Sequence, residues 1–153
     1  MATIAEKLKG IGLDLPGAAT PAGSYVPIGK SGNLLFIAGQ IGPLAKVPSA
    51  RLGAELSVEQ GRDAAKAAGL AVLAQIAAGT DGHMSSVRRI VRLGVFIAAT
   101  ADFTQHPEVA NGASELMVSV FGEAGRHARA AVGVASLPRG AAVEIEAVVE
   151  IAE

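Results

Sequence analysis

The chain has 153 residues, of which 50% are hydrophobic and 18% are charged. This length fits one domain, and the composition excludes a disordered chain, which would be poor in apolar residues and rich in charge. Aromatic residues make up only 3%, so the core must be built from aliphatic side chains. With a net charge of -1 the chain has no overall positive potential to attract nucleic acid, whose binding depends on cations that neutralise phosphates. With no Cys, disulfides and thiolate chemistry are excluded.

The N-terminal segment predicts a short amphipathic helix over residues 3–12, with Ile4 and Leu8 on its apolar face. Charged residues interrupt this segment, so it is not a secretory signal, and no other stretch is long and apolar enough to span a bilayer. We therefore expect a soluble cytoplasmic protein with no membrane contact. Its single domain covers 1–153, with 1–22 as an N-terminal extension.

A β-hairpin is predicted after this extension. The stretch SYVPIGKSGNLLFIAGQ contains a short strand, a Lys-Ser-Gly-Asn turn and an apolar strand over 34–38. Residues 42–56 are expected to be irregular, because they contain Pro43 and Pro48.

A long helix is predicted from Ser57 to about Ala78. Ser57 is a candidate N-cap, and Gln60 three residues later completes a capping-box pattern. Small and aliphatic residues recur at spacings of three and four, and they give the helix a face that can lie close to a sheet. These residues are Gly61, Ala65, Ala68, Val72 and Ile76.

A strand rich in β-branched residues follows over 87–98, and a second helix begins at Pro107 and ends at Gly122. The strand's expected buried face holds residues at alternate positions. They are Val91, Leu93, Val95 and Ile97.

Two further strands are predicted at about 128–135 and at 142–151, joined by a turn. The last strand alternates clearly between an apolar face and an acidic face that begins at Glu144. Together the elements predict an α+β fold in which two helices pack on one face of a mixed sheet.

Arg129 is the first candidate functional residue, because it stands in the apolar segment ARAAVGVASL. A buried guanidinium is costly unless it is paired or binds an anionic ligand. A Glu of the adjacent last strand is one candidate partner. Alternatively, Arg129 and that Glu line a pocket, where the Arg binds a substrate carboxylate and the Glu exchanges a proton with a water molecule.

No P-loop, nucleophile elbow or zinc-binding pattern is present in the sequence. The three histidines at positions 83, 106 and 127 have no metal-ligand spacing, and each is expected to be a surface or capping residue.

The segment GRHARAAVGVASLPRGAAVEIEAVVEI resembles the C-terminal signature of the reactive-intermediate deaminase family, also called the YjgF family or L-PSP endoribonuclease family. Upstream, Ser24-Tyr25, LLFIAGQIG and VANGASELM resemble further elements of the same family in the same order. The likeness runs from about residue 22 to the end, and the extra N-terminal segment suggests a longer branch.

This resemblance implies a chorismate-mutase-like fold assembled as a homotrimeric barrel with clefts between subunits. Such clefts hydrolyse enamines and imines of amino acids to keto acids and ammonia, with no cofactor and no metal. By position, Arg129 would bind the substrate carboxylate and Glu144 would activate the attacking water. The cleft would be lined by Tyr25, Gly39, Asn111 and Ala131, of which Ala131 stands where many members carry Cys and leaves only its backbone carbonyl for the water.

Two other functions remain open from the sequence. The protein could be a trimer that binds small carboxylates without catalysis, because hydroxyl and thiol groups common in the family are missing. It could also cleave RNA, as the family label suggests and as Arg88, Arg89 and Arg92 would permit. Arg88 and Arg92 are expected to share one strand face while Arg89 points away. Nucleic-acid binding is not expected, because three cations at a strand start are more often a solvated edge.

Overall fold

The structure is a computed structural model that describes residues 2–42 and 50–153. In chain order its helices and strands are α1 Ile4–Gly10, β1 Ile28–Ser31, β2 Leu34–Ile41, α2 Val58–Ala78, β3 Val87–Ala98, α3 His106–Phe121, β4 Ala128–Val134 and β5 Val143–Ile151. Every predicted helix and strand is present close to its expected bounds. The irregular stretch expected over 42–56 lies partly outside the described residues.

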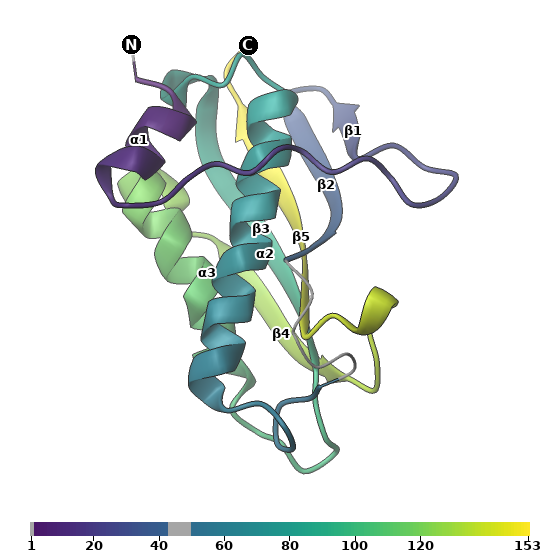
Figure 1. The fold of residues 1–153 in the computed structure, drawn as a ribbon. Helices are drawn as coiled ribbons and strands as arrows, with labels where there is room; N and C mark the ends of the chain where they lie inside the picture. Colours follow the sequence, from purple (N-terminus) through teal and green to yellow (C-terminus); the bar gives the residue numbers. More distant parts are fainter. Residues whose placement is uncertain (1, 43–49) are drawn as a thin grey trace.

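The strands form one mixed sheet in the order β1-β2-β5-β3-β4. Strands β3 and β4 pair in parallel, and α3 is the crossover between them, whereas the other neighbours are antiparallel. Helices α2 and α3 cover one face of this sheet (Figure 1), which confirms the predicted α+β arrangement. No described helix covers the other face, which we call the open face.

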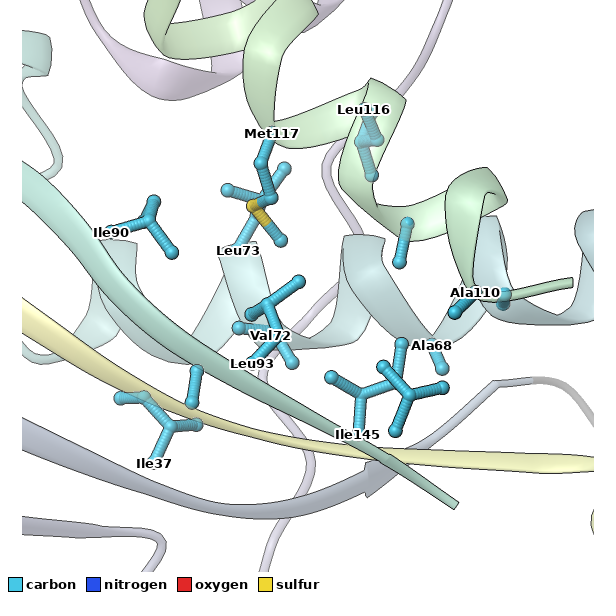
Figure 2. Close-up of a cluster of buried hydrophobic side chains, with 14 of the residues drawn as sticks. Ile37, Ala68, Val72, Leu73, Ile90, Leu93, Ala110, Leu116, Met117 and Ile145 are labelled. Carbon is cyan, nitrogen blue, oxygen red and sulfur yellow. The ribbon is translucent and has the colours of Figure 1, made fainter. Parts of the chain in front are cut away.

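The core lies between this helix layer and the sheet. Figure 2 shows Val72 and Leu73 of α2, Leu93 of β3 and Ile145 of β5 pointing into one apolar layer. The predicted alternation of β5 is confirmed, since the residues of its expected apolar face are all buried: Val143, Ile145, Ala147, Val149 and Ile151.

Helix α2 begins as its sequence predicts. The Ser57 hydroxyl accepts a hydrogen bond from the Gln60 N–H at 3.2 Å, and the Gln60 side chain accepts one from the Ser57 N–H at 2.9 Å. The small-residue face is buried as expected. This capped end fixes where α2 starts, and its small face lets the helix lie close to its neighbours.

The N-terminal extension is part of the core. Ile4 and Leu8 of α1 are both 0% exposed, and the Ile4 N–H donates to the Gly82 carbonyl at 2.9 Å. The segment that follows α1 then crosses the outer side of α2 (Figure 1), where the Gln75 amide donates to the Ala19 carbonyl at 2.9 Å. The segment therefore stabilises the helix layer.

Two bulges in β3 change the predicted face assignments. The register with β5 shifts between Val87 and Arg89 and again between Ile90 and Arg92. Each bulge breaks the two-residue period of a strand. Ile90 therefore replaces Val91 on the buried face.

The expectation that Arg88 and Arg92 share a face opposite Arg89 is wrong for the same reason. Arg89 pairs with Glu150 and Arg92 pairs with Val148, and both partners belong to the open face of β5. Arg92 also forms an ion pair with Glu146 at 3.3 Å.

Candidate functional site

Arg129 points toward the helix layer from β4, the edge strand of the sheet. It pairs with Leu93 of β3, whose side chain is fully buried on the helix-covered face. The Arg129 Nη1 group donates to Asn111 Oδ1 at 2.8 Å and to Ser114 Oγ at 3.0 Å, both on α3. Nη2 makes only a long 3.5 Å contact with the Pro107 carbonyl. The guanidinium is thus half-buried and held by neutral groups, and no carboxylate of the described residues pairs with it.

His127 extends this hydrogen-bonded cluster. Its Nε2 lies 2.8 Å from Ser114 Oγ, and its Nδ1 lies 2.6 Å from the Gly125 carbonyl oxygen. Burial lowers the pKa of His127, and the charge of Arg129 lowers it further, whereas the hydrogen bond to the Gly125 carbonyl opposes this shift. The expectation that His127 is a surface or capping residue holds in part: the ring is half-buried, and its Nδ1 caps the carbonyl of Gly125, the last residue of the short 3-10 helix Gly122–Gly125. One signal was available, since His127 and Arg129 are two residues apart, the spacing that places side chains on one face of a strand.

Glu144 lies on the open face, at the centre of the sheet. Gly39 of β2 is in contact with it, since a Cβ atom at Gly39 would lie 2.9 Å from the Glu144 Cδ. Burial raises the pKa of Glu144, and the nearby Glu146 carboxylate raises it further. In the described part of the chain no group donates a hydrogen bond to the Glu144 carboxylate. Gly39 therefore provides the space that this poorly solvated carboxylate occupies.

These residues form two separate groups. We call Asn111, Ser114 and Arg129 the arginine half-site, and Gly39 and Glu144 the glutamate half-site. Strand β3 lies between β4 and β5, so the two half-sites are two strand spacings apart, about 10 Å. Glu144 pairs with Phe96, which lies three residues beyond Leu93 and therefore on the opposite face.

The prediction that Arg129 neighbours a Glu of the last strand is therefore wrong. The crossover through α3 returns the chain to the side of β3, which makes β4 the parallel neighbour of β3 rather than of β5. Arg129 finds Asn111 and Ser114 as partners, and it does not form an ion pair with Glu144.

The two remaining predicted residues lie beside different half-sites. Ala131 pairs with the buried Val95, so its methyl group faces the helix layer like Arg129 and packs against the core. Tyr25 is 52% exposed, and its hydroxyl accepts a long 3.4 Å hydrogen bond from the Ala22 N–H. Its loop joins β2 where the Pro27 carbonyl accepts from the Ala38 N–H at 2.9 Å, one residue before Gly39.

A cleft of about 470 Å³ lies at the C-terminal end of β4, beyond the arginine half-site. Gly133 lines it and lies on the same strand face as Arg129 and Ala131, four and two residues earlier. A Cβ at Gly133 would lie 2.7 Å from His106 Nε2, and the His106 ring packs edge-on against Phe103. Sequence analysis did not predict these cleft residues, because no motif carries them.

Residues 2–42 and 50–153 contain no cluster of candidate metal ligands and no helix that could span a membrane. No three His, Asp or Glu side chains there gather as metal ligands would. None of the helices in this part of the chain has the length and apolar character needed to cross a bilayer.

The family model described as "YjgF/chorismate_mutase-like, putative endoribonuclease" matches residues 5–149. The chain therefore belongs to the YjgF/chorismate-mutase-like family, which confirms the resemblance seen in the sequence.

Three relatives place the chain within this family. It is 46% identical over 151 residues to Protein TCP17 of Trypanosoma cruzi, covering 97% of this chain and 94% of that protein. It is 32% identical over 139 residues to a 2-iminobutanoate/2-iminopropanoate deaminase of Dermatophagoides farinae, covering 91% and 94%. The crystal structure of Atu1372, a protein of unknown function from Agrobacterium tumefaciens, is 41% identical, has a TM-score of 0.87 and covers 98% and 94%. The first and third likenesses include nearly the whole N-terminal segment.

Proposed function

We propose that the protein is a homotrimeric hydrolase of reactive imines and enamines derived from amino acids. The observation that carries this proposal is the separation of the half-sites. Arg129 and Glu144 lie on opposite faces of one sheet, so a small ligand cannot contact both within one chain. A site that uses both residues requires the arginine half-site of one subunit to face the glutamate half-site of another.

The open face supports assembly. Phe36 and Val132 are 47% and 46% exposed there, and Val132 shares a cross-strand row with Phe96 and Glu144. Exposed apolar side chains on a sheet face rimmed by charges are typical of contact surfaces. Contact between copies of this face would also remove Glu144 further from water.

The chemistry fits the groups available. Arg129 binds the carboxylate of a 2-imino acid, because a guanidinium matches both carboxylate oxygens. Water adds to the carbon of the protonated C=N group while Glu144 accepts one of its protons, which gives a neutral carbinolamine. Glu144 returns this proton to the amino group, ammonia leaves as the C–N bond breaks and the C–O bond becomes C=O, and Glu144 takes up the hydroxyl proton and passes it to the ammonia, which leaves a 2-keto acid. Enamines enter the same route after tautomerising to imines.

The raised pKa of Glu144 suits this role, because a carboxylate with a pKa nearer to neutral is a stronger base when ionised. The likeness to a 2-iminobutanoate/2-iminopropanoate deaminase supports the substrate class. The reaction needs proton transfer and positioning, which side chains provide.

The first experiment measures 2-keto acid release from imines that an amino-acid oxidase generates in the same vessel. We expect the protein to accelerate release, and Arg129→Ala and Glu144→Gln to abolish the acceleration while each variant stays folded. Arg126→Ala is the matched control, because Arg126 is three residues away and pairs only with Glu123 in the described chain. No acceleration over buffer across several imino acids would rule out the proposed reaction.

A complementation experiment tests whether the site crosses a subunit boundary. When Arg129→Ala and Glu144→Gln chains are co-expressed, random mixing should restore about one quarter of the sites of a trimer, since each mixed trimer contains one intact pair. A site formed within one chain would give no recovery.

Calorimetry of Glu144→Gln with a 2-keto acid separates catalysis from binding alone: a binding protein would show affinity but no turnover in any variant. Cleavage of RNA, which the family description names, is measured on the same preparations.

A further inference from the structure

Arg129 is the first residue of a directional chain of hydrogen bonds that runs through Ser114 and His127 to the Gly125 carbonyl. The Gly125 carbonyl can only accept, so the His127 Nδ1, 2.6 Å away, carries a proton. The lowered pKa of His127 leaves the imidazole neutral near pH 7, so Nε2 has no proton and accepts. Ser114 must then donate its hydroxyl proton to Nε2, and its oxygen accepts from Arg129 Nη1.

Both ends of this hydrogen-bond chain are fixed to α3. Ser114 is a residue of α3, as is Asn111, the other acceptor of Nη1. At the far end, Gly125 packs so closely that a Cβ there would lie 2.1 Å from the Met117 carbonyl oxygen of α3. The Gly125 carbonyl therefore has a fixed place against the helix, and His127 connects it to Ser114.

The hydrogen bonds to Asn111 and Ser114 occupy Nη1 of the guanidinium and leave the edge formed by Nε and Nη2 available. Both N–H groups of Nη1 are used, by Asn111 and by Ser114. Nη2 has only the 3.5 Å contact with the Pro107 carbonyl, and no group in the described chain accepts from Nε. Nε and Nη2 together form the edge of a guanidinium that binds a carboxylate through two parallel hydrogen bonds.

We propose that Ser114 and His127 are positioning residues, which hold Nη1 so that the Nε–Nη2 edge of Arg129 is presented to the substrate carboxylate. This inference rests on the proposed function of Arg129 and adds two residues that do not contact the substrate. A free arginine side chain samples many rotamers and loses this conformational entropy when it binds a ligand. A preformed donor edge reduces that entropic cost in the binding step.

The test uses one pair of disruptive variants and one pair of conservative variants. Ser114→Ala and His127→Leu each break the chain. Ser114→Thr keeps the hydroxyl, and His127→Gln keeps an acceptor within reach of Ser114. Ser119→Ala, an exposed serine on α3, is the matched control. Melting temperatures establish that each variant is folded, and two disruptive variants are used so that one remains if the other fails to fold.

The first measurement is the NMR order parameter of the Arg129 Nε–H group in the ligand-free protein. We expect an ordered group in the wild type, the conservative variants and Ser119→Ala, and a mobile group in Ser114→Ala and His127→Leu. The second measurement is calorimetry with pyruvate. The dissociation constant should rise about 10-fold in the disruptive variants, the factor expected when a charge-assisted contact loses its geometry, and should return to the wild-type value in the conservative ones.

The outcomes separate this inference from the proposed function. If Arg129 stays ordered in both disruptive variants, the inference is wrong whether or not pyruvate binds. Unchanged pyruvate affinity in variants with a mobile Arg129 would also overturn it. If the wild type binds no pyruvate but Arg129 loses order as expected, the positioning chain is supported and the proposed function fails.

Discussion

In the arginine half-site the polar neighbours accept hydrogen bonds from the guanidinium and stabilise its charge, whereas in the glutamate half-site the surroundings destabilise the charged form of the carboxylate. Arg129 donates to two oxygens of α3, and both acceptors belong to its own subunit. Glu144 has no hydrogen-bond donor among the described residues, and burial and Glu146 both raise its pKa. One group is preorganised within the chain, and the other lacks its partners there.

Under the proposed function, this difference indicates what assembly would have to supply. A guanidinium that is already positioned needs only an anionic ligand. A carboxylate on an open sheet face gains a defined environment only when a second surface covers that face. The glutamate half-site should therefore respond more strongly than the arginine half-site to changes on the open face.

The largest expected effect comes from Phe36→Glu. Phe36 is 47% exposed on the open face, and burying a carboxylate there against a second subunit would be costly. We expect a folded monomer in sedimentation experiments and complete loss of keto acid release. Ile11→Glu, which changes a 43% exposed residue beside the helix layer, is the matched control and should remain assembled. A Phe36→Glu trimer with full turnover would mean that the half-sites meet by another surface.

Next in size is Gly39→Ala. The added methyl group would lie 2.9 Å from the Glu144 Cδ, and the flexible carboxylate end of Glu144 would move away from it. Displacing a catalytic group by an ångström lowers turnover by about 100-fold, so we expect a loss of that order with little change in melting temperature.

Gly29→Ala is the control for this substitution, because the nearest atom to a Cβ at Gly29 is 3.9 Å away. Equal turnover in the two variants would show that Glu144 does not act in the reaction. A Gly39→Ala protein that does not fold would instead show that the sheet cannot adjust at this position.

Local signals in the sequence predicted the elements because neighbouring residues encode them. The capping box at Ser57 places the start of α2, and the strict alternation from Val143 to Ile151 places β5 and its faces. The apolar surroundings of Arg129 made it a candidate, and the family signature added Glu144 and the role of each residue. None of these signals states which strands are neighbours.

Three features were not predicted: the strand order around β4, the bulges in β3 and one long-range hydrogen bond. The spacing of β3, α3 and β4 is that of a parallel crossover unit, and this reading would have placed β4 beside β3 rather than β5. The bulges in β3 have no comparable signal, since the residues that stand out of register are ordinary strand formers. The hydrogen bond between Ser114 and His127 joins a helix to the start of a strand, so only the fold brings these two residues together.

A smaller effect is expected from Asn111→Asp, which changes the arginine half-site. A carboxylate at this position would become a charged partner for Arg129 Nη1, now bonded to the neutral Asn111 oxygen at 2.8 Å. The new ion pair should compete with a ligand carboxylate and weaken pyruvate binding by about 10-fold, while the melting temperature stays the same or rises.

Ser119→Asp is the control for the added charge, because it lies eight residues along the same helix, about 12 Å from Asn111. If both substitutions weaken pyruvate binding equally, the effect is one of net charge and the contact between Asn111 and Arg129 has no special role.

The smallest effect is the pH dependence of stability at Glu144. Because the folded pKa of Glu144 lies above its unfolded value, the folded protein binds more protons between the two values, and stability falls as pH rises through that window. Glu144→Gln removes this loss, so the variant should melt above the wild type at pH 8, and the difference should disappear at acid pH. Asp102→Asn should behave in the opposite way: the hydrogen bond from Thr100 lowers the pKa of Asp102, which contributes stability above its unfolded pKa that is lost as pH falls. If Glu144→Gln lowered the melting temperature at pH 8, Glu144 would have a stabilising partner in the assembled protein, and the contrast between the half-sites would hold only for the isolated chain.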